Sequence, residues 1–426
     1  MSLRARLAPL ALLLLPALAR AEDVTAPFID PGDVPLPDWA KTVAPNRADV
    51  AIYQQAGDVQ KRRGTMMRDA RLSLFGAHRG AHCGGRWLSV GPMAWVCSDD
   101  VTMSADPPTL GLGLPAMADG LPYRYYFAGA EGADAYDTFQ YAGDESPALQ
   151  MEKGWSVPIV EQRSKGGELW GRTRAGLWIA MRELGPSRPF AFHGEVIPAE
   201  AKLDVAWVNA ERTNVYPDAT AQKKPLETRV RFQLLHVREE KSTREGMFLR
   251  VNDDDKPAAW VRAKDIARPS LAAPPSEVSG AATGERWIDV ELASQTLVAY
   301  QGTTPVFATM VSTGRGAQGS ETATPRGVHR IWVKLHTTAM DNLEKEDAEH
   351  YYSIEDVPWV QFFDKGVALH AAFWHREFGR VRSHGCVNMA PLDAHRMFAF
   401  TGPHIPSGWA AALPTPLEPG TWVRVR

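Results

Sequence analysis

The sequence predicts a mainly β protein that is divided into several domains. Short segments of alternating polar and apolar residues, such as 86–90 and 247–251, lie between turns rich in glycine and aspartate. Alternation with a period of two is typical of antiparallel strands. One tryptophan motif recurs along the chain, and a segment rich in proline, alanine and serine at 268–284 follows its last copy. A chain of 426 residues is long enough for several domains with separate cores.

The N-terminus has the pattern of a secretory signal peptide. Arg4 and Arg6 precede an apolar run at 7–18, and Ala-Arg-Ala at 19–21 supplies the small residues of a cleavage site. The run is too short to span a bilayer comfortably. We therefore predict a signal peptide at 1–21, no transmembrane segment, and an exported protein of the periplasm or cell wall. A buried N-terminal helix is the alternative.

The tryptophan motif begins at Trp95, Trp178 and Trp260. In each copy a β-branched residue follows the tryptophan, and an acidic and an aliphatic residue come after a gap of three residues. Small SH3-like barrels often close with a Trp-Val strand, and the first and third copies resemble bacterial SH3-like modules. Short matches of this kind also arise by coincidence. The expectation is a tandem array of small SH3-like β-barrels.

These features give the domain boundaries. In the last third of the chain, 288–300 and 328–334 alternate like strands, and 391–398 is predicted to form a helix. The expected divisions are a signal peptide (1–21), a proline-rich lead-in (22–45), an SH3-like module (46–106), a middle β module (107–200), a second SH3-like module (201–267), a linker (268–284) and a C-terminal domain (285–426).

The composition argues against two classes of partner. The net charge is −3 and the isoelectric point is near 6.5, so nothing favours binding to nucleic acid or to an anionic membrane. The chain has 14 tryptophans. In small β domains we expect most of them in the cores rather than on binding surfaces.

The three cysteines fit an oxidising compartment. Cys83 and Cys97 lie close together in one small segment, and a disulfide between neighbouring strands is predicted. Cys386 is left over, and an odd cysteine in an exported protein indicates a reactive thiol. The alternative is a small buried hydrophobic residue, but the Ser-His-Gly sequence before Cys386 is a poor core sequence.

The segment around Cys386 has the residues needed for thiol chemistry. Residues 383–388 read Ser-His-Gly-Cys-Val-Asn, and His370 precedes the cysteine. An ordinary cysteine is mostly protonated at neutral pH, so a thiol nucleophile needs a base. A glycine beside it lets backbone N–H groups approach a reacting carbonyl oxygen. The pattern predicts acyl transfer through a cysteine.

The preceding residues extend the pattern. Residues 368–375 read Ala-Leu-His-Ala-Ala-Phe-Trp-His, and Phe-Gly follows at 378–379. With the Ser-His-Gly-Cys-Val-Asn run, this closely resembles the signature of the L,D-transpeptidases, bacterial cell-wall enzymes with a YkuD-like domain. The resemblance covers roughly 285–426 and implies a β-rich catalytic domain there. It extends upstream through short motifs at 295–297, 311–314, 324–327 and 340–341.

The resemblance also implies roles for individual residues, and no cofactor. Cys386 is the expected nucleophile, and His370 the proton donor and acceptor, oriented by the backbone carbonyl of Ala371. The N–H groups of His384 and Gly385, with that of Cys386, are the expected oxyanion donors. Many family members have arginine at the position of Asn388, but another branch has asparagine there, so this departure affects substrate contacts more than chemistry; many also have glycine at the position of Ala371. Expected substrate contacts are Trp374, His375, Ser383, Asn388 and Tyr352.

The implied substrate is a peptidoglycan stem tetrapeptide. Attack on the bond between its third residue, a diamino acid, and the terminal D-alanine would release D-alanine and form a thioester on the cysteine. An amine of a second stem would then give a 3→3 cross-link, or a protein would act as the acceptor. The N-terminal modules would hold the enzyme on its polymeric substrate.

Three other functions fit the same residues. Water in place of the amine would make the protein a thiol carboxypeptidase or endopeptidase, and loss of activity would leave a wall-binding protein. A zinc site is the third, although the ligand spacing matches no common zinc motif. Its ligands would come from His370, His375, His384, Cys386 and His395.

Overall fold

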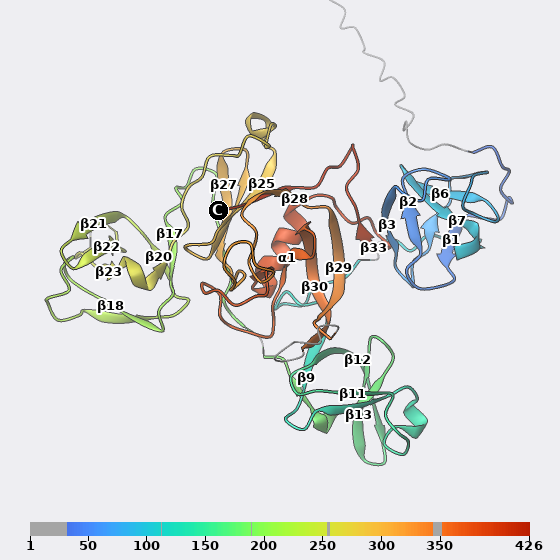
Figure 1. Cartoon of the computed structure of the whole chain (residues 1–426), viewed down its shortest axis with the longest axis horizontal. Helices are drawn as coiled ribbons and strands as arrows, with labels where there is room; N and C mark the ends of the chain where they lie inside the picture. The colour runs from blue at the N-terminus through green and yellow to red at the C-terminus, as the bar shows by residue number, and fades with distance from the viewer. Residues whose placement is uncertain (1–31, 112, 189, 254–255, 344–351) are drawn as a thin grey trace, which may run out of the picture.

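The chain forms a mainly β, multidomain protein, as predicted (Figure 1). In the described part of the chain, the one α-helix is α1, and no helix has the length and apolar character needed to cross a membrane. The predicted signal peptide lies outside the described residues. The computed structural model describes residues 32–111, 113–188, 190–253, 256–343 and 352–426.

Three lobes surround the central C-terminal domain in Figure 1. The middle module (107–200) has a hydrophobic core of its own, whereas the core of the first module (46–106) also includes Trp409 of the C-terminal domain. The strands of the first module are β2 Ala51–Tyr53, β3 Arg62–Met66, β4 Leu72–Ser73, β5 Gly76–His78, β6 Trp87–Gly91, β7 Ala94–Cys97 and β8 Val101–Ser104, and β1 Thr42–Pro45, from the segment expected to be the lead-in, pairs with β4 and β8. Those of the middle module are β9 Arg124–Ala128, β10 Ala133–Tyr136, β11 Leu149–Met151, β12 Ser156–Lys165, β13 Glu168–Thr173, β14 Trp178–Ala180 and β15 Leu184–Pro186.

The third module (201–267) also has its own core. It contains three small sheets, of which the first joins its two ends by pairing β17 with β24. Its strands are β17 Val205–Val208, β18 Arg212–Val215, β19 Glu227–Val230, β20 Leu234–His236, β21 Glu239–Thr243, β22 Gly246–Arg250, β23 Trp260–Arg262 and β24 Ile266–Ala267.

The repeated tryptophan motif has the same local structure in all three modules. The tryptophan lies in β7, β14 or β23, a 3-10 helix follows, and the next short strand begins at the aliphatic residue of the motif. The tryptophan side chain is buried in each copy. The three 3-10 helices are η1 Ser98–Asp100, η3 Met181–Glu183 and η4 Ala263–Asp265; η2 Phe139–Tyr141 and η5 Ala281–Thr283 lie elsewhere.

The predicted disulfide is present in the first module. Cys83 and Cys97 are joined, with their Cα atoms 5.6 Å apart, within the usual range for this bond. Cys97 ends β7, and both cysteines belong to the cluster that contains the buried Trp87. Cys386 is a free cysteine.

The C-terminal domain has a six-stranded sheet and a second group of strands around one core. The sheet order is β16-β27-β26-β25-β34-β28, and α1 packs against β30 and β31 of the second group. The elements are β16 Glu195–Val196, β25 Arg286–Glu291, β26 Thr296–Gln301, β27 Thr304–Met310, β28 Gly327–Arg330, β29 Val333–Asp341, β30 Ser353–Asp364, β31 Val367–Ala371, β32 Val387–Met389, α1 Pro391–Phe400, β33 Trp409–Ala412 and β34 Trp422–Val425.

Two sequence-based expectations change in detail. The alternating run at 288–300 is a hairpin, β25 and β26, because the chain turns at Gln295, whose φ is +54°. The segment 328–334 likewise contains the end of β28 and the start of β29. The predicted helix at 391–398 is confirmed as α1, which begins with a proline at a position where the missing N–H is not needed.

Backbone pairing joins the modules to the C-terminal domain. In the first module β3 pairs with β33, and in the middle module β12 pairs with β30. β16, from the segment assigned to the middle module, pairs with β27 and so becomes the edge strand of the C-terminal sheet. The segment assigned as a linker also packs on this domain, since Val278 is buried against Trp287 and Tyr300.

Candidate active site

The parallel pairing of β31 with β32 brings His370 and Cys386 together. In this pair His370 lies directly opposite Asn388. Cys386 is two residues before Asn388, and alternate residues of a strand point to the same face. Cys386 and His370 therefore share one face of the pair as diagonal neighbours, a separation that side chains on a sheet can bridge.

His370 is held in one orientation and one tautomer. Its side chain is 2% exposed, and Nδ1 lies 2.9 Å from the carbonyl oxygen of Ala371, as the resemblance implied. A carbonyl only accepts hydrogen bonds, so Nδ1 carries the proton of the neutral ring and Nε2 has the lone pair. Burial lowers the pKa of His370 to about 4, which keeps the ring neutral at physiological pH. The ring stacks on Trp374 at 5.7 Å between centroids.

Cys386 is a half-buried thiol beside an aromatic wall. Its Sγ lies 3.8 Å from the carbonyl oxygen of Gly366. The side chain packs in one cluster with Tyr352, Phe373 and Trp374. Burial raises the pKa of Cys386 to about 11, so the thiol is protonated at neutral pH. The pair is therefore a neutral thiol and a neutral imidazole.

The backbone before Cys386 is fixed by two hydroxyl groups. The Ser383 hydroxyl donates to the carbonyl oxygen of Cys386, and Thr324 donates to that of Gly385 at 2.6 Å. Gly385 has a φ of +126°, and a Cβ there would lie 3.3 Å from the carbonyl oxygen of Ala323. A glycine is therefore required at this position.

Two expectations about this turn change. The N–H of Gly385 donates to the Ser383 hydroxyl at 3.1 Å, so it is already committed and is not aimed at a substrate. Ser383 is buried and serves to brace the turn, instead of lining a cleft as expected. Among described residues, none accepts a hydrogen bond from the N–H of Cys386, which is the remaining donor at the thiol.

His375 and Asn388 also differ from the expected substrate contacts. Both side chains are buried, and His375 Nε2 lies 2.8 Å from the side-chain amide of Asn388. His375 Nδ1 accepts from the N–H of Glu377 at 3.1 Å. In the neutral ring Nε2 therefore carries the proton; Asn388 Nδ2 is the atom at 2.8 Å, and because two donors cannot pair, the amide is assigned the flipped orientation with its oxygen toward Nε2. Burial, with the charge of Arg382, lowers the pKa of His375 to about 3. The buried pair lies beside His370, because Asn388 is its direct partner in the strand register.

His384 and Tyr352 form the exposed side of the site. Their rings stack at 5.7 Å with an interplanar angle of 18°. Arg315 Nη2 lies 2.8 Å from His384 Nε2, and a guanidinium is always a donor, so this nitrogen accepts. Burial raises the pKa of Tyr352, as does the neighbouring Cys386, so its phenol stays neutral. Trp374, which is half-buried, stacks on the ring of His370 and packs in the same cluster as Tyr352.

Sequence reasoning missed Arg315 and the role of Thr324. Thr324 belongs to one of the motifs that carried the resemblance, but nothing in the sequence says that its hydroxyl reaches Gly385, 61 residues away. Arg315 follows the Gly314 motif and reaches His384 across 69 residues. Both contacts depend on the pairing of Gly314 with Ser383, which the sequence pattern does not reveal.

The zinc alternative has no support in the geometry. His370 Nδ1 and both nitrogens of His375 are within hydrogen-bond distance of protein groups. In the described part of the chain, the group of histidine, cysteine and acidic side chains close enough to share a metal ion is Cys83, Cys97 and Asp99. Its two sulfur atoms are already joined in the disulfide.

Several solved structures are similar to parts of this chain. A mutant L,D-transpeptidase of Enterococcus faecium is 22% identical to this chain. The match covers 33% of this chain and 50% of the mutant's chain, with a TM-score of 0.25. The catalytic domain of the E. faecium enzyme is 23% identical over 34% of this chain and 98% of its own, also with a TM-score of 0.25. An L,D-transpeptidase of Mycobacterium smegmatis is 12% identical over 63% and 99%, again with a TM-score of 0.25.

The match to the mutant E. faecium L,D-transpeptidase spans only half of the length of that chain. No curated protein matches the chain. Residues 285–425 match the family model YkuD, described as the L,D-transpeptidase catalytic domain. The C-terminal third of the chain is thus a YkuD L,D-transpeptidase catalytic domain.

Proposed function

We propose that the protein is an exported L,D-transpeptidase that cross-links peptidoglycan stem peptides through Cys386. One observation carries the proposal. Within a domain of this family, a free thiol shares a strand face with an imidazole whose Nδ1 is held by a backbone carbonyl, so that Nε2 has the lone pair. This is the arrangement that a general base for a thiol requires.

In the first half-reaction, Cys386 Sγ attacks the carbonyl carbon between the diamino acid and the terminal D-alanine of a stem tetrapeptide. A sulfur–carbon bond forms while His370 Nε2 accepts the thiol proton. The bond between the carbonyl carbon and the D-alanine nitrogen then breaks, and the proton passes from Nε2 to the departing amine. The products are a thioester on Cys386 and free D-alanine.

In the second half-reaction, an amine of the acceptor attacks the thioester carbonyl carbon. Nε2 of His370 accepts a proton from this amine as the new carbon–nitrogen bond forms. The carbon–sulfur bond breaks, and the proton returns to Sγ. Overall, one amide bond is broken and another is formed, and the enzyme is regenerated without an external reactant. When the acceptor is a second stem, the new amide is a 3→3 cross-link.

The N–H of Cys386 is the proposed donor to the oxyanion in both steps, with the N–H of His384 beside it. Removal of one such donor in other enzymes costs about 100-fold or more in rate. Support comes from the turn itself, because the carbonyl groups of Gly385 and Cys386 are both fixed by hydroxyl donors. This fixes the direction of the N–H of Cys386 before substrate arrives.

The substrate is proposed to lie between the ring pair of Tyr352 and His384 on one side and Trp374 on the other. Trp374 stacks on His370, Tyr352 and Trp374 pack in one cluster with Cys386, and His384 stacks on Tyr352. Arg315, which donates to His384, carries a positive charge at the mouth of this cleft. The carboxylates of a stem peptide are the groups that it would attract.

Intact mass spectrometry of the protein with a disaccharide tetrapeptide tests this proposal. The expected result is an adduct on Cys386, release of D-alanine, and a cross-linked dimer that retains one D-alanine. Cys386→Ser should abolish the adduct and His370→Gln should slow it strongly. Tripeptide and D-alanine without dimer would show that water, and not an amine, is the acceptor, so that the protein is a hydrolase. An adduct that survives in Cys386→Ser would refute the assignment of the nucleophile.

A further inference from the structure

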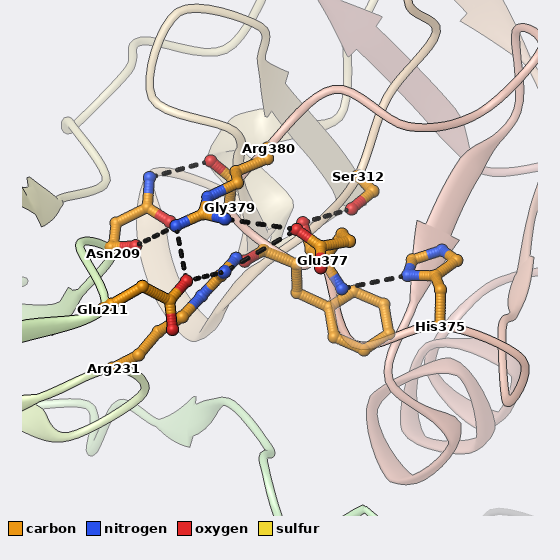
Figure 2. Close-up of polar contacts among 9 residues, drawn as sticks. Asn209, Glu211, Arg231, Ser312, His375, Glu377, Gly379 and Arg380 are labelled. Atoms are coloured by element: carbon orange, nitrogen blue, oxygen red, sulfur yellow. Dashed lines mark hydrogen bonds and ion pairs between the residues drawn. The ribbon is translucent and has the colours of Figure 1, made fainter.

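The loop between β31 and β32, residues 372–386, is held from outside by the third module. Figure 2 shows the contacts. Asn209 Nδ2 donates to the carbonyl oxygen of Gly379 at 2.8 Å, and Arg231 Nη2 donates to that of Phe378 at 3.1 Å. Both donors belong to the third module, and both acceptors lie at the outer bend of the 372–386 loop.

Charged side chains complete this contact. One oxygen of Glu211 lies 3.0 Å from Arg231 Nη1 and 2.8 Å from Arg380 Nη2. The carboxylate of Glu377 lies 3.3 Å from Arg380 and 3.6 Å from Arg231. The side chain of Arg231 is 8% exposed while that of Glu211 is 73% exposed. The buried guanidinium of Arg231 is therefore screened less by water than the exposed ion pair of Arg380 with Glu211.

The fit between the module and the loop is close. Gly379 has a φ of +91°, and a Cβ at this residue would lie 2.4 Å from the side-chain oxygen of Asn209. Phe378 is fully buried and packs in one cluster with Phe192 and with Trp207 of β17. A bend in this position depends on the third module as much as on the catalytic domain.

From the bend, a short series of hydrogen bonds reaches the candidate catalytic pair. The carbonyl of Glu377 accepts from the hydroxyl of Ser312 at 2.8 Å, and its N–H donates to His375 Nδ1. His375 Nε2 meets Asn388, and Asn388 is the direct strand neighbour of His370. A continuous series of contacts thus links the bend to the direct strand neighbour of His370.

We propose that the third module holds the active site in its catalytic geometry, with Asn209 and Arg231 as positioning residues. They hold the 372–386 loop so that Glu377 fixes the tautomer and orientation of His375, and His375 in turn fixes Asn388. This proposal rests on the proposed function and deepens it. Positioning errors near 1 Å are known to cost about 100-fold in rate, so a loop released at one end should lose much of its activity.

The test compares Asn209→Ala and Arg231→Met with Arg238→Met, all in the full-length protein. Arg238 is the matched control, because its ion pairs with Asp204 and Asp253 stay inside the same module. Thermal unfolding first establishes that each variant is folded. If Arg231→Met does not fold, Glu211→Gln takes its place, since Glu211 is exposed and makes no backbone contact with the loop in the described structure.

Two measurements are made on each variant. Nuclear magnetic resonance of isotope-labelled histidine reports the tautomer of His375, which is protonated on Nε2 in the wild type; we expect a mixture of tautomers in the two loop variants and no change in the control. The rate of D-alanine release should fall about tenfold or more in the loop variants, with binding to sacculi unchanged.

The two proposals fail in different ways. Wild-type protein that never releases D-alanine would refute the proposed function, while the tautomer of His375 would still test the loop. Folded loop variants that keep the wild-type tautomer and the wild-type rate would overturn the positioning role. Equal losses in Arg238→Met would assign the effect to general destabilisation of the module, which also overturns it.

Discussion

The free thiol of Cys386 should remain protonated far above neutral pH. Burial raises its pKa to about 11, against an ordinary value of about 8.5. At about pH 9 an ordinary cysteine is roughly three-quarters thiolate, whereas a group with a pKa near 11 is about 1% thiolate. The lowered pKa of His370, about 4, points the same way, because a neutral imidazole gives no charge to stabilise a thiolate.

The assay is the ultraviolet absorbance of the thiolate between about pH 5 and 9. The spectrum of Cys386→Ser is subtracted, which removes the contribution of ionised tyrosines. We expect almost no difference signal below pH 9 in the protein without substrate. His370→Gln should give the same flat titration, since no ion pair exists to be lost.

A thiolate signal at pH 6 to 7 that disappears in His370→Gln would refute this reasoning. It would mean that Cys386 and His370 form a thiolate–imidazolium pair in the free protein, and that burial is outweighed by their mutual attraction. The proton transfer would then precede substrate binding. In the neutral pair derived from the geometry, it accompanies the attack on the substrate carbonyl.

Three further predictions concern stability. The pKa of His370 and that of His375 are lowered by burial to about 4 and about 3, so their contribution to the free energy of unfolding is complete above pH 6.5 and is lost as the pH falls to these values. This contribution is about 3 kcal/mol for His370. In urea unfolding, the free energy of unfolding should therefore fall less between pH 7 and pH 4.5 in His370→Gln than in the wild type. Lys334 is 1% exposed and donates from Nζ to the carbonyl oxygens of Phe398 and Thr401 at the end of α1. Lys334→Met should lower the free energy of unfolding by about 2 kcal/mol, because two buried acceptors lose their donor. An unchanged urea midpoint would show that removing a buried charge compensates for this loss. Gly385→Ala should cost about 1–3 kcal/mol, because alanine disfavours a φ of +126°, and should also slow acylation by a carbapenem; a variant with wild-type stability and rate would contradict the account of the turn.

The sequence was sufficient for features that depend on neighbouring residues. The disulfide of Cys83 with Cys97 follows from their closeness in the chain, and α1 follows from a local run that begins with proline. The repeated tryptophan motif indicated short strands, and each copy places its tryptophan in a strand, while the expected SH3-like barrels stay a prediction. The family of the C-terminal domain was also evident, because its motifs are short and contiguous.

Burial and long-range contacts were beyond a reading of the sequence. His375 and Asn388 are polar residues beside the candidate nucleophile, which suggested a cleft, yet they satisfy each other's hydrogen bonds in the interior. Only tertiary packing decides whether these two side chains line a cleft or form a buried pair, since either arrangement places them near the thiol. The same holds for Asn209, whose contact with Gly379 spans 170 residues.

The modules are attached to the catalytic domain by strand pairing. β16, β12 and β3 each come from a segment before residue 200 and pair with strands of the catalytic domain. A flexible tether would need no such backbone pairing, because effective concentration depends only on reach. Strand pairing instead fixes orientation, and buried side chains such as Val278 along the connecting segment add to this. The modules are therefore placed to shape the catalytic domain, in addition to any contact that they make with a polymer.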